Sequence, residues 1–590
     1  MARYSSLPGV LVLALSAMAH VASSVPNKQP PPSKSLNRTA DYLIVGGGPS
    51  GLVLAEQLSR NPHVKVVLLE AGPDPSLDPL VYTPAYFFET SKYFWNFSSA
   101  PDPALNGSTP NLWQGRALGG GSAVNGMGIC RGASSVFDEW AEISGNQGLA
   151  WDSGMFDAFK ATTHFQEDVH PADQTPVNRS SFGDGPLEIT SQRFQLAIDR
   201  PFVDKLTSSL DIPEIDFMSG YGIGVTEQVG AIRASNRTRS YAWNTFGWLA
   251  VNRPNFEVRH DAWATKIGFS GKTASSVTYN NTLTNTMVTI GAKEIVVAAG
   301  AIGSPHLLML SGVGPADQLE AVGIPVVQDS PHIGQNLMDH HVAQLVYEAA
   351  SDEGTVWQWE DNSTVRDEAQ REYAANGGGL LGVPDGNVFG SFRLPDSVFD
   401  GLGDYHVSLP ADRPDIIYEY TTAPLFEGLL TNIPNVSTIT PFVALVQPEG
   451  RGNVTLASAD YREQPVINSA YWATPEDKAA ILYAYKQYRQ IMSSPELRPW
   501  ATTELYPGAN VTSDADLWAA IQTTSGSFHH PVGTVAIGSA LDVNWRVKGI
   551  KGLRVVGTPA APNIITCHTQ GTAYALGYRA AVDIIAEDGL

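Results

Sequence analysis

Two short segments near the C-terminus each place a histidine among small residues that constrain the backbone: HHPVGT at residues 529–534 and CHTQGT at residues 567–572. Of all side chains, imidazole titrates closest to neutral pH, so two of them on rigid segments can move a proton and orient a hydroxyl group. We predict that His530 and His568 are this catalytic pair. We expect His529 to line the pocket wall, because adjacent side chains in an extended segment point in opposite directions.

A nucleotide-binding pattern lies near the other end of the chain. Residues 41–45 (DYLIV) are an apolar run typical of a strand, followed by GGGPSG at 46–51 and a segment with helical periodicity. Glycines at this spacing permit a tight turn, a close approach of the backbone to a pyrophosphate and close helix–strand packing, while the helix N-terminus supplies free N–H donors. The cofactor contacts predicted here are Gly46, Gly48, Pro49, Ser50 and Gly51.

A second predicted strand, residues 64–69, ends at Glu70, which lies 19 residues beyond Gly51. A carboxylate at this distance accepts hydrogen bonds from the hydroxyls of an adenosine ribose and disfavours a 2′-phosphate. We therefore predict that Glu70, with Ala71 beside it, contacts a dinucleotide. These residues alone leave both NAD and FAD open.

Three longer motifs carry a family resemblance. GRALGGGSAVNGM at 115–127 and GAIGSPHLLMLSGVG at 300–314 resemble the two signatures of the glucose-methanol-choline (GMC) oxidoreductases, which bind FAD. IGQNLMDH at 333–340 and the two histidine segments complete a set in family order, from about residue 41 to residue 585. The chain resembles the secreted fungal branch that includes aryl-alcohol oxidases, patulin synthase and versicolorin B synthase.

The resemblance implies FAD-dependent oxidation of a primary alcohol that is aromatic, allylic or part of a natural product, with oxygen or a quinone as electron acceptor. The histidine of the HPxGT segment, here His530, acts in this family as base or hydrogen-bond partner, and His568 matches the second active-site residue. Both would face the flavin N5, which takes the hydride. Their titrations can be coupled, so the identity of the base stays open, with His530 as first choice. Further flavin contacts are expected at Asn125, Gly126, Met127, Gly128, Ala560, Thr569 and Gln570.

Two departures from the family pattern bear on function. Val124 stands where relatives of the choline oxidase type carry the histidine that bonds flavin covalently, so we expect non-covalent FAD. The segment VVGTP at 555–559 lacks the aspartate found in many relatives, which removes one expected polar contact near the flavin. A redox-neutral cyclase or lyase of the versicolorin B synthase type, which retains FAD, is the alternative function.

The predicted fold class is α/β (α+β overall). A Rossmann-like FAD-binding domain, formed by 38–160, 235–345 and 515–590, is interwoven with a substrate domain formed by 161–234 and 346–514. We expect the substrate domain to contain an antiparallel β-sheet with helices, including a helix from 475 to 492 and strands at 416–421 and 442–446. Candidates to roof the flavin, although more often core residues, are Tyr93, Trp357, Trp359, Phe389, Phe392, Tyr405 and Phe426.

Charge excludes some partners, and an N-terminal leader pattern with sequons predicts a secreted enzyme. A net charge of −22 over 590 residues argues against nucleic acid or anionic membranes as partners. Residues 1–22 read as a signal peptide, with Arg3, an apolar stretch at 7–15 that is too short to span a membrane, and an AMA cleavage site. We expect no other membrane span, a location outside the cell, in the wall or in the endomembrane lumen, and N-glycans at sequons. The sequons start at Asn37, Asn96, Asn106, Asn178, Asn236, Asn280, Asn362, Asn435, Asn453 and Asn510.

Only two cysteines occur, Cys130 and Cys567. A bridge between them is possible in an oxidising compartment, but we expect two buried, unpaired thiols, because cysteine is among the most buried residue types even without a bridge. No metal site is expected, since the histidines lack the spacing to cysteine or carboxylate that ligand sets show.

Overall fold

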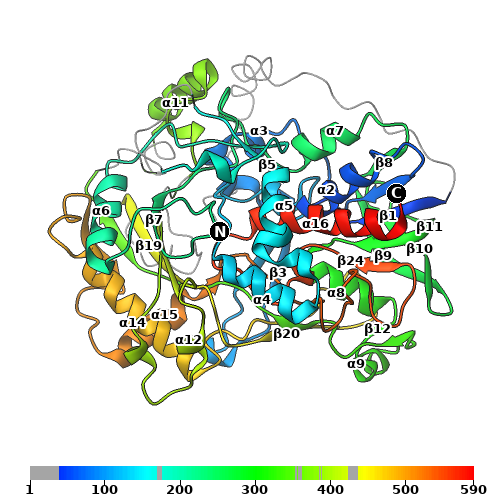
Figure 1. Ribbon diagram of the computed structural model, residues 1–590. Coiled ribbons are helices and arrows are strands. Elements are labelled where there is room, and N and C mark those ends of the chain that lie inside the picture. The colour runs from blue at the N-terminus through cyan, green and yellow to red at the C-terminus, as the bar shows by residue number, and fades with distance from the viewer. Residues whose placement is uncertain are drawn as a thin grey trace.

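The computed structural model describes residues 39–168, 176–351, 355, 362–384, 386, 388–422 and 436–590. The predicted signal peptide, the sequons at Asn37 and Asn435, and the aromatic candidates Trp357, Trp359 and Phe426 lie outside the described residues. Figure 1 shows the described chain as two sheets with helices packed around each of them.

The first sheet has a parallel core built from distant parts of the chain. Its strand order is β8-β2-β1-β11, and the short β24 pairs with β11. The apolar residues of β1 and β2 are almost fully buried, as in parallel strands that are covered on both faces. The strands are β1 (Ala40–Val45), β2 (Val66–Leu69), β8 (Phe256–Arg259), β11 (Thr286–Val297), β24 (Leu553–Val555), and the antiparallel extension β10 (Thr273–Asn281) and β9 (Ala262–Ser270).

Three helices on the first sheet position cofactor-binding segments. Helix α2 (Pro49–Leu58) follows the glycine turn after β1 and packs against the C-terminal helix α16 (Gln570–Asp588), as Figure 1 shows. Helix α8 (Gly300–Leu310) follows β11 and packs against β9. The glycine turn, the second signature and the segment of His568 therefore meet at one edge of the sheet, where ligands of open α/β sheets bind.

The second sheet is antiparallel, with strand order β22-β16-β19-β18-β17-β7; β15 also pairs with β19, and β23 pairs with β15. Helix α14 (Pro475–Met492) packs on β19 and matches the predicted helix residue for residue. Strands β15 and β23 belong to this sheet although they fall inside the segments assigned above to the FAD domain. The strands are β7 (Gly224–Glu227), β15 (His341–Gln344), β16 (Val346–Ala349), β17 (Val388–Phe392), β18 (Ile416–Thr421), β19 (Thr438–Leu445), β22 (Ala501–Tyr506) and β23 (Gly526–Ser527).

The remaining elements connect or cover the two sheets, and the predicted fold class is confirmed. The longer remaining helices are α4 (Ser134–Ser144), α5 (Phe156–Thr162), α6 (Asp199–Leu210), α9 (Ala316–Ala321), α11 (Ser363–Asn376) and α15 (Asp514–Thr524), and the shorter ones are α3 (Pro79–Tyr82), α7 (Trp248–Ala250) and α12 (Tyr405–Ser408). Short strand pairs are β3 (Phe94–Ser98) with β4 (Asn111–Gly115), β5 (Thr163–Phe165) with β6 (Leu187–Ile189), β12 (Val313–Gly314) with β13 (Gln328–Asp329), and β14 (Gln335–Leu337) with β20 (Gly452–Thr455) and β21 (Val466–Asn468).

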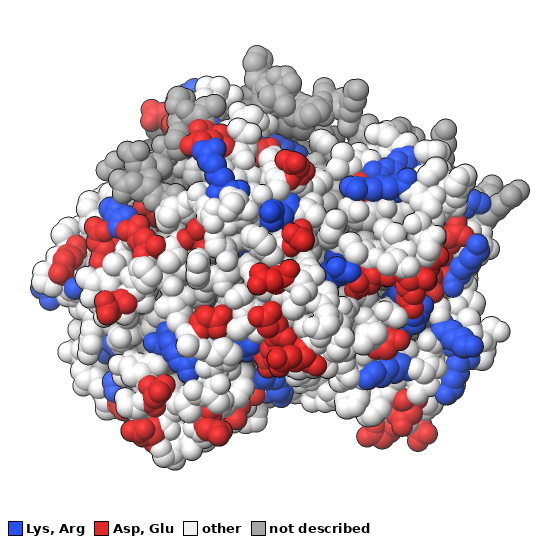
Figure 2. Space-filling model, in the orientation of Figure 1, with Lys and Arg blue, Asp and Glu red and all other residues white. Residues whose placement is uncertain are grey.

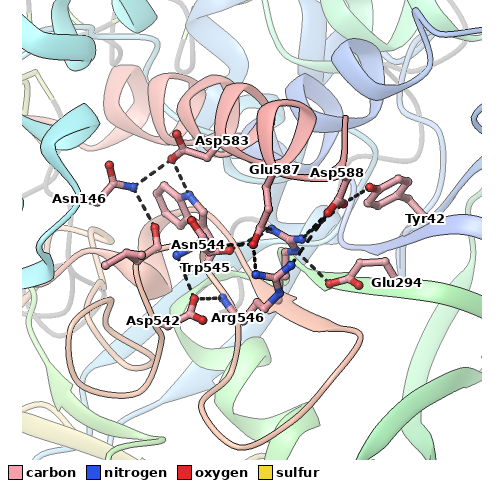
Figure 3. A network of polar contacts seen from close by, with 12 residues as sticks. Tyr42, Asn146, Glu294, Asp542, Asn544, Trp545, Arg546, Asp583, Glu587 and Asp588 are labelled. Atoms are coloured by element: carbon pink, nitrogen blue, oxygen red, sulfur yellow. Dashed lines mark hydrogen bonds and ion pairs between the residues drawn. The ribbon is translucent and has the colours of Figure 1, made fainter. Parts of the chain in front are cut away.

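A charged network anchors the C-terminal end of α16 to the first sheet (Figure 3). The fully buried guanidinium of Arg554, on β24, donates from Nε to Glu294 on β11 at 2.9 Å and from Nη1 to Glu587 on α16 at 2.9 Å. It also contacts Asp588 at 3.3 Å, and the hydroxyl of Tyr42 on β1 donates to the same carboxylate. These carboxylates raise the pKa of Arg554, so the cation is held in its charged form and fixes the helix relative to the strands.

Cys130 and Cys567 form a disulfide bond, with their Cα atoms 6.2 Å apart. The expectation of two unpaired thiols is therefore wrong, although both residues are buried as expected. The chain folds so that the segment after the first signature lies beside the segment that carries His568, and 437 residues of separation hide this proximity in the sequence.

Acidic and basic side chains are interspersed over the face drawn in Figure 2. Within the described ranges, no helix has the length and apolar character needed to cross a membrane. In the same part of the chain, histidine, cysteine, aspartate and glutamate do not gather in groups of three or more that are suited to a metal ion.

Candidate active site

One cavity of about 590 Å³ runs from the glycine turn to the histidine pair. Fourteen of the sixteen predicted site residues line this cavity, and they come from both ends of the chain. Gly51 and Ala560 do not line it: Gly51 is covered by the carbonyl of Gly46, in keeping with a packing role, and buried Ala560 lies behind Thr558 and Pro559. The predicted residues that line the cavity are Gly46, Gly48, Pro49, Ser50, Glu70, Ala71, Asn125, Gly126, Met127, Gly128, His530, His568, Thr569 and Gln570.

The glycine turn leaves open space at the N-terminus of α2. Gly46 has φ +114°, and a Cβ there would collide with the backbone of Ala298. A Cβ on Gly48 would come no closer than 3.9 Å to its nearest neighbour, the Cα of Gly120. Because α2 begins directly at Pro49, its unpaired N–H groups face this space. The turn therefore fits a pyrophosphate.

Glu70 is buried beside this turn. One carboxylate oxygen accepts a hydrogen bond from the backbone N–H of Gly47 at 2.8 Å, and the other accepts from Gly72 at 2.8 Å. Burial raises the pKa of Glu70 to about 7, against the lowering effect of these hydrogen bonds. The carboxylate is thus fixed at the wall of the cavity, where it can accept hydrogen bonds from a ribose.

An aromatic cluster lines the cavity at the Glu70 end, and no motif in the sequence predicted it. Trp95 and Trp263 have ring centroids 5.1 Å apart, and Tyr461 lies 4.9 Å from Trp263. The guanidinium of Arg116 lies 4.6 Å from the Trp95 ring, and its Nε is buried with no partner within the described structure. The flat rings that line this end of the cavity suit a planar base.

The first signature is held to the N-terminus of α16 by side-chain hydrogen bonds. Asn125 donates to the side-chain oxygen of Gln570, and its own oxygen accepts from Met127 N–H at 3.1 Å and from Arg239 at 2.9 Å. Arg239 is fully buried, which lowers its pKa to about 9. The side-chain nitrogen of Gln570 is buried without a partner in the described structure, so it is free to donate to a cofactor.

His530 is held in one tautomer by a buried histidine. His340 Nε2 lies 2.8 Å from the carbonyl of Ile565, and His340 Nδ1 lies 2.9 Å from His530 Nδ1. A carbonyl only accepts hydrogen bonds, so His340 carries its proton on Nε2 and accepts at Nδ1, because burial lowers its pKa to about 3 and keeps it neutral. His530 therefore donates from Nδ1, and its Nε2 carries a lone pair.

His568 lies between His530 and a carboxylate. Its Nδ1 is 3.3 Å from His530 Nε2, and its Nε2 is 2.8 Å from Oε1 of Glu419, which projects from β18. The backbone N–H of His568 donates to Sγ of Cys130 at 3.2 Å, so the disulfide also fixes this residue. Burial, together with the neighbouring imidazoles, lowers the pKa of His530 well below its ordinary value. His530 is thus a neutral imidazole, whereas His568 faces the carboxylate of Glu419.

A buried aspartate holds the backbone of the HHP segment. Asp339 accepts from the N–H of His530 at 2.9 Å and from the hydroxyl of Ser527, and burial raises its pKa to about 7. His529 adopts φ +62°, lines the cavity and stacks on Trp113 with centroids 5.4 Å apart. The positive φ turns the two adjacent imidazoles to different parts of the wall.

The wall around the histidine pair is aromatic, but it does not contain the residues proposed from sequence. Phe528 lies 4.8 Å from the ring of His530 and 5.2 Å from that of His568. Phe389 contacts His568 at 5.7 Å from outside the cavity. Tyr93, Phe392 and Tyr405 also lie away from the cavity, and Tyr93, Phe389 and Phe392 are buried core residues, the interpretation that the sequence analysis favoured. The phenylalanines that line the cavity are Phe87, Phe88, Phe94, Phe97, Phe442 and Phe528.

Sequence reasoning also missed His340, Asp339 and Glu419. The first two end the IGQNLMDH motif, which was recognised without a role for its polar residues. Glu419 had a visible signal, because it is the one charged residue in the predicted strand IIYEYT. A carboxylate in a buried strand requires a partner, and here the partner is His568.

Comparisons with known proteins agree with this geometry. Family models described as GMC oxidoreductase match residues 40–342 and 448–577. Patulin synthase of Aspergillus clavatus is 29% identical, across 93% of this chain and 92% of its own length. Versicolorin B synthase of Aspergillus parasiticus is 29% identical, across 92% of this chain and 88% of its own.

Among solved structures, a formate oxidase of Aspergillus oryzae superposes with a TM-score of 0.84 at 25% identity, covering 94% of this chain and 100% of that one. Family models thus match most of the chain, and the cavity has a dinucleotide end and a histidine end. The chain belongs to the GMC oxidoreductase family and is an FAD-dependent oxidoreductase.

Proposed function

We propose that the protein oxidises a primary alcohol, aromatic, allylic or part of a natural product, to the aldehyde, with His530 as the base. The observation that carries the proposal is the fixed tautomer of His530, whose unprotonated Nε2 faces His568 in the cavity. Family membership supports an alcohol substrate, and the aromatic walls support an apolar or aromatic one.

The residues of this chain divide the work of the proposed reaction. Nε2 of His530 accepts the proton of the substrate hydroxyl, a role that contributes roughly 10²–10⁴-fold in rate. His340 keeps that nitrogen free by occupying Nδ1. His568, whose Nε2 faces the carboxylate of Glu419, donates from Nδ1 to the oxygen of the substrate alcohol. The aromatic walls exclude water from this exchange.

FAD, when bound, supplies the hydride acceptor. The glycine turn, Glu70 and Gln570 would hold it, and Val124 offers no atom for a covalent link, which supports a dissociable cofactor. Oxygen or a quinone would serve as the final electron acceptor. The similarity to patulin synthase and versicolorin B synthase supports a place in fungal secondary metabolism, and the leader and sequons support a secreted glycoprotein.

An anaerobic panel of alcohols tests the proposal. Purified protein with FAD is mixed with benzyl, cinnamyl and aliphatic alcohols while the oxidised flavin absorbance near 450 nm is followed. Bleaching with formation of the aldehyde supports alcohol oxidation, and admission of oxygen or a quinone afterwards identifies the acceptor. Product without bleaching would instead establish the redox-neutral cyclase or lyase chemistry of the versicolorin B synthase type.

A further inference from the structure

Two glutamines line the histidine end of the cavity and have no part in the proton transfer proposed above. Gln192 and Gln228 are 2% and 6% exposed. Gln192 donates from Nε2 to the backbone carbonyl of Gln228 at 3.0 Å, which fixes the two residues to each other. The side-chain oxygen of Gln192 is buried and has no partner among the described residues. A buried acceptor of this kind requires a donor.

Gln228 lies beside the catalytic pair. A Cβ placed on Gly128 would collide with Oε1 of Gln228 and would lie 3.6 Å from Cδ2 of His568. The amide of Gln228, the backbone of Gly128 and the ring of His568 therefore converge on one point. A β-bridge between Gly128 and Gly230 fixes the register of this approach. A substrate group that contacts Gln228 would therefore lie within a few bonds of the substrate group that contacts His568.

The charges of the lining restrict what can bind here. The described lining contains a single cationic side chain of the lysine or arginine type, Arg462, which adjoins Tyr461 of the aromatic cluster near Glu70. The carboxylate of Glu419 already faces His568. The described lining thus offers an anionic substrate no lysine or arginine beside the histidines, whereas the two amides can both donate to and accept from a neutral group.

We propose that Gln192 and Gln228 form a recognition site for a second, neutral hydroxyl group on the substrate, close to the alcohol that is oxidised. The inference rests on the proposed alcohol oxidation and narrows its substrate class to hydroxylated aromatic alcohols. The hydroxyl donates to the unpaired oxygen of Gln192 and accepts from the amide of Gln228. Sites built to hydrogen-bond a hydroxyl reject analogues that lack it, because the buried amide is then left unpaired.

The test compares 3-hydroxybenzyl alcohol with 3-methylbenzyl alcohol, which has nearly the same shape but cannot hydrogen-bond at that position. Anaerobic flavin reduction gives the ratio of their second-order rate constants. We expect the native protein to favour the hydroxylated alcohol by at least ~10²-fold. Gln192→Met and Gln228→Leu should each reduce this ratio at least ~10-fold. Gln522→Leu, at a half-buried glutamine outside the cavity, should keep the native ratio.

Binding of ketones that cannot be oxidised separates this inference from the proposed function. The dissociation constants of 3-hydroxyacetophenone and 3-methylacetophenone are measured from the change in flavin absorbance, with FAD content as the check that each variant is folded. If no alcohol bleaches the flavin, the proposed function is wrong. Even then, tighter binding of 3-hydroxyacetophenone than of 3-methylacetophenone, abolished by Gln192→Met, would support the glutamine site. Equal ratios in the native protein and both variants would overturn the inference, as would tighter binding of 3-carboxyacetophenone.

Discussion

The two ends of the cavity are built from different parts of the polypeptide. At the dinucleotide end, a short continuous stretch from β1 through the glycine turn to α2 forms the binding surface from backbone groups. At the histidine end, side chains from four separated segments meet, carrying His340, Glu419, His530 and His568. The dinucleotide end is formed by backbone groups, so replacements there should act by changing the backbone conformation and should lower FAD affinity. The histidine end is formed by side chains, so replacements there should remove a reacting group and should slow flavin reduction.

The largest effect is expected from His530→Ala. Flavin reduction by the best alcohol should slow at least ~10²-fold, since the lone pair that accepts the hydroxyl proton is removed. FAD should stay bound, because the dinucleotide end is untouched. Stopped-flow absorbance measures the rate, and the exposed His332→Ala serves as control. A near-native rate would remove His530 from the role of base.

Gly46→Ala tests the opposite end. Its φ of +114° and the predicted collision with the backbone of Ala298 mean that the turn must shift, so FAD affinity should fall at least ~10-fold. The control is Gly271→Ala, which also has positive φ but open space around it. Affinity is measured by titration of the apoprotein with FAD. Unchanged affinity would show that the turn does not hold the cofactor.

Removal of the disulfide by Cys130→Ser with Cys567→Ser tests how far the histidine end depends on a covalent tie. The free energy of unfolding should fall by about 2–5 kcal/mol, because the bridge closes a very long loop and constrains the unfolded chain. Denaturant unfolding measures the loss. A change in FAD affinity larger than the change in flavin reduction rate would contradict the assignment of this bridge to the histidine end.

A further prediction concerns acid stability. His341 is buried, and burial lowers its pKa to about 4, against the raising effects of Asp477 and of a backbone hydrogen bond at Ser469. Below about pH 6.5, His341 therefore binds a proton in the unfolded chain but stays neutral in the folded protein. The contribution of this residue to stability is complete above pH 6.5 and falls as pH drops towards 4, by about 3 kcal/mol in all.

His341→Leu should remove that part of the acid sensitivity. The melting temperature of the native protein should fall more between pH 6.5 and pH 4 than that of the variant, as measured by calorimetry. If the melting temperatures of the two proteins changed with pH in parallel, the pKa of His341 would not be lowered in the folded protein.

Sequence reasoning worked where the site is local and failed where it is not. GGGPSG, Glu70 and the helix from 475 to 492 are patterns of a few neighbouring residues whose spacing fixes their conformation, and each lies where it was expected. The disulfide, the roles of His340 and Glu419, and the aromatic walls arise from contacts across hundreds of residues. Periodicity and spacing carry no record of such contacts, which explains why the thiols were misjudged and the aromatic residues of the cavity wall could not be identified.

The amino-acid sequence by itself determined the strand–turn–helix that can bind a dinucleotide and the presence of two histidines on constrained segments, because backbone preferences act between neighbours. Only the tertiary structure decided which nitrogen of His530 carries the proton, which carboxylate faces His568 and which glutamines line the cavity beside it. Protonation and pairing depend on burial and on atoms within about 3 Å, and folding alone brings those atoms together.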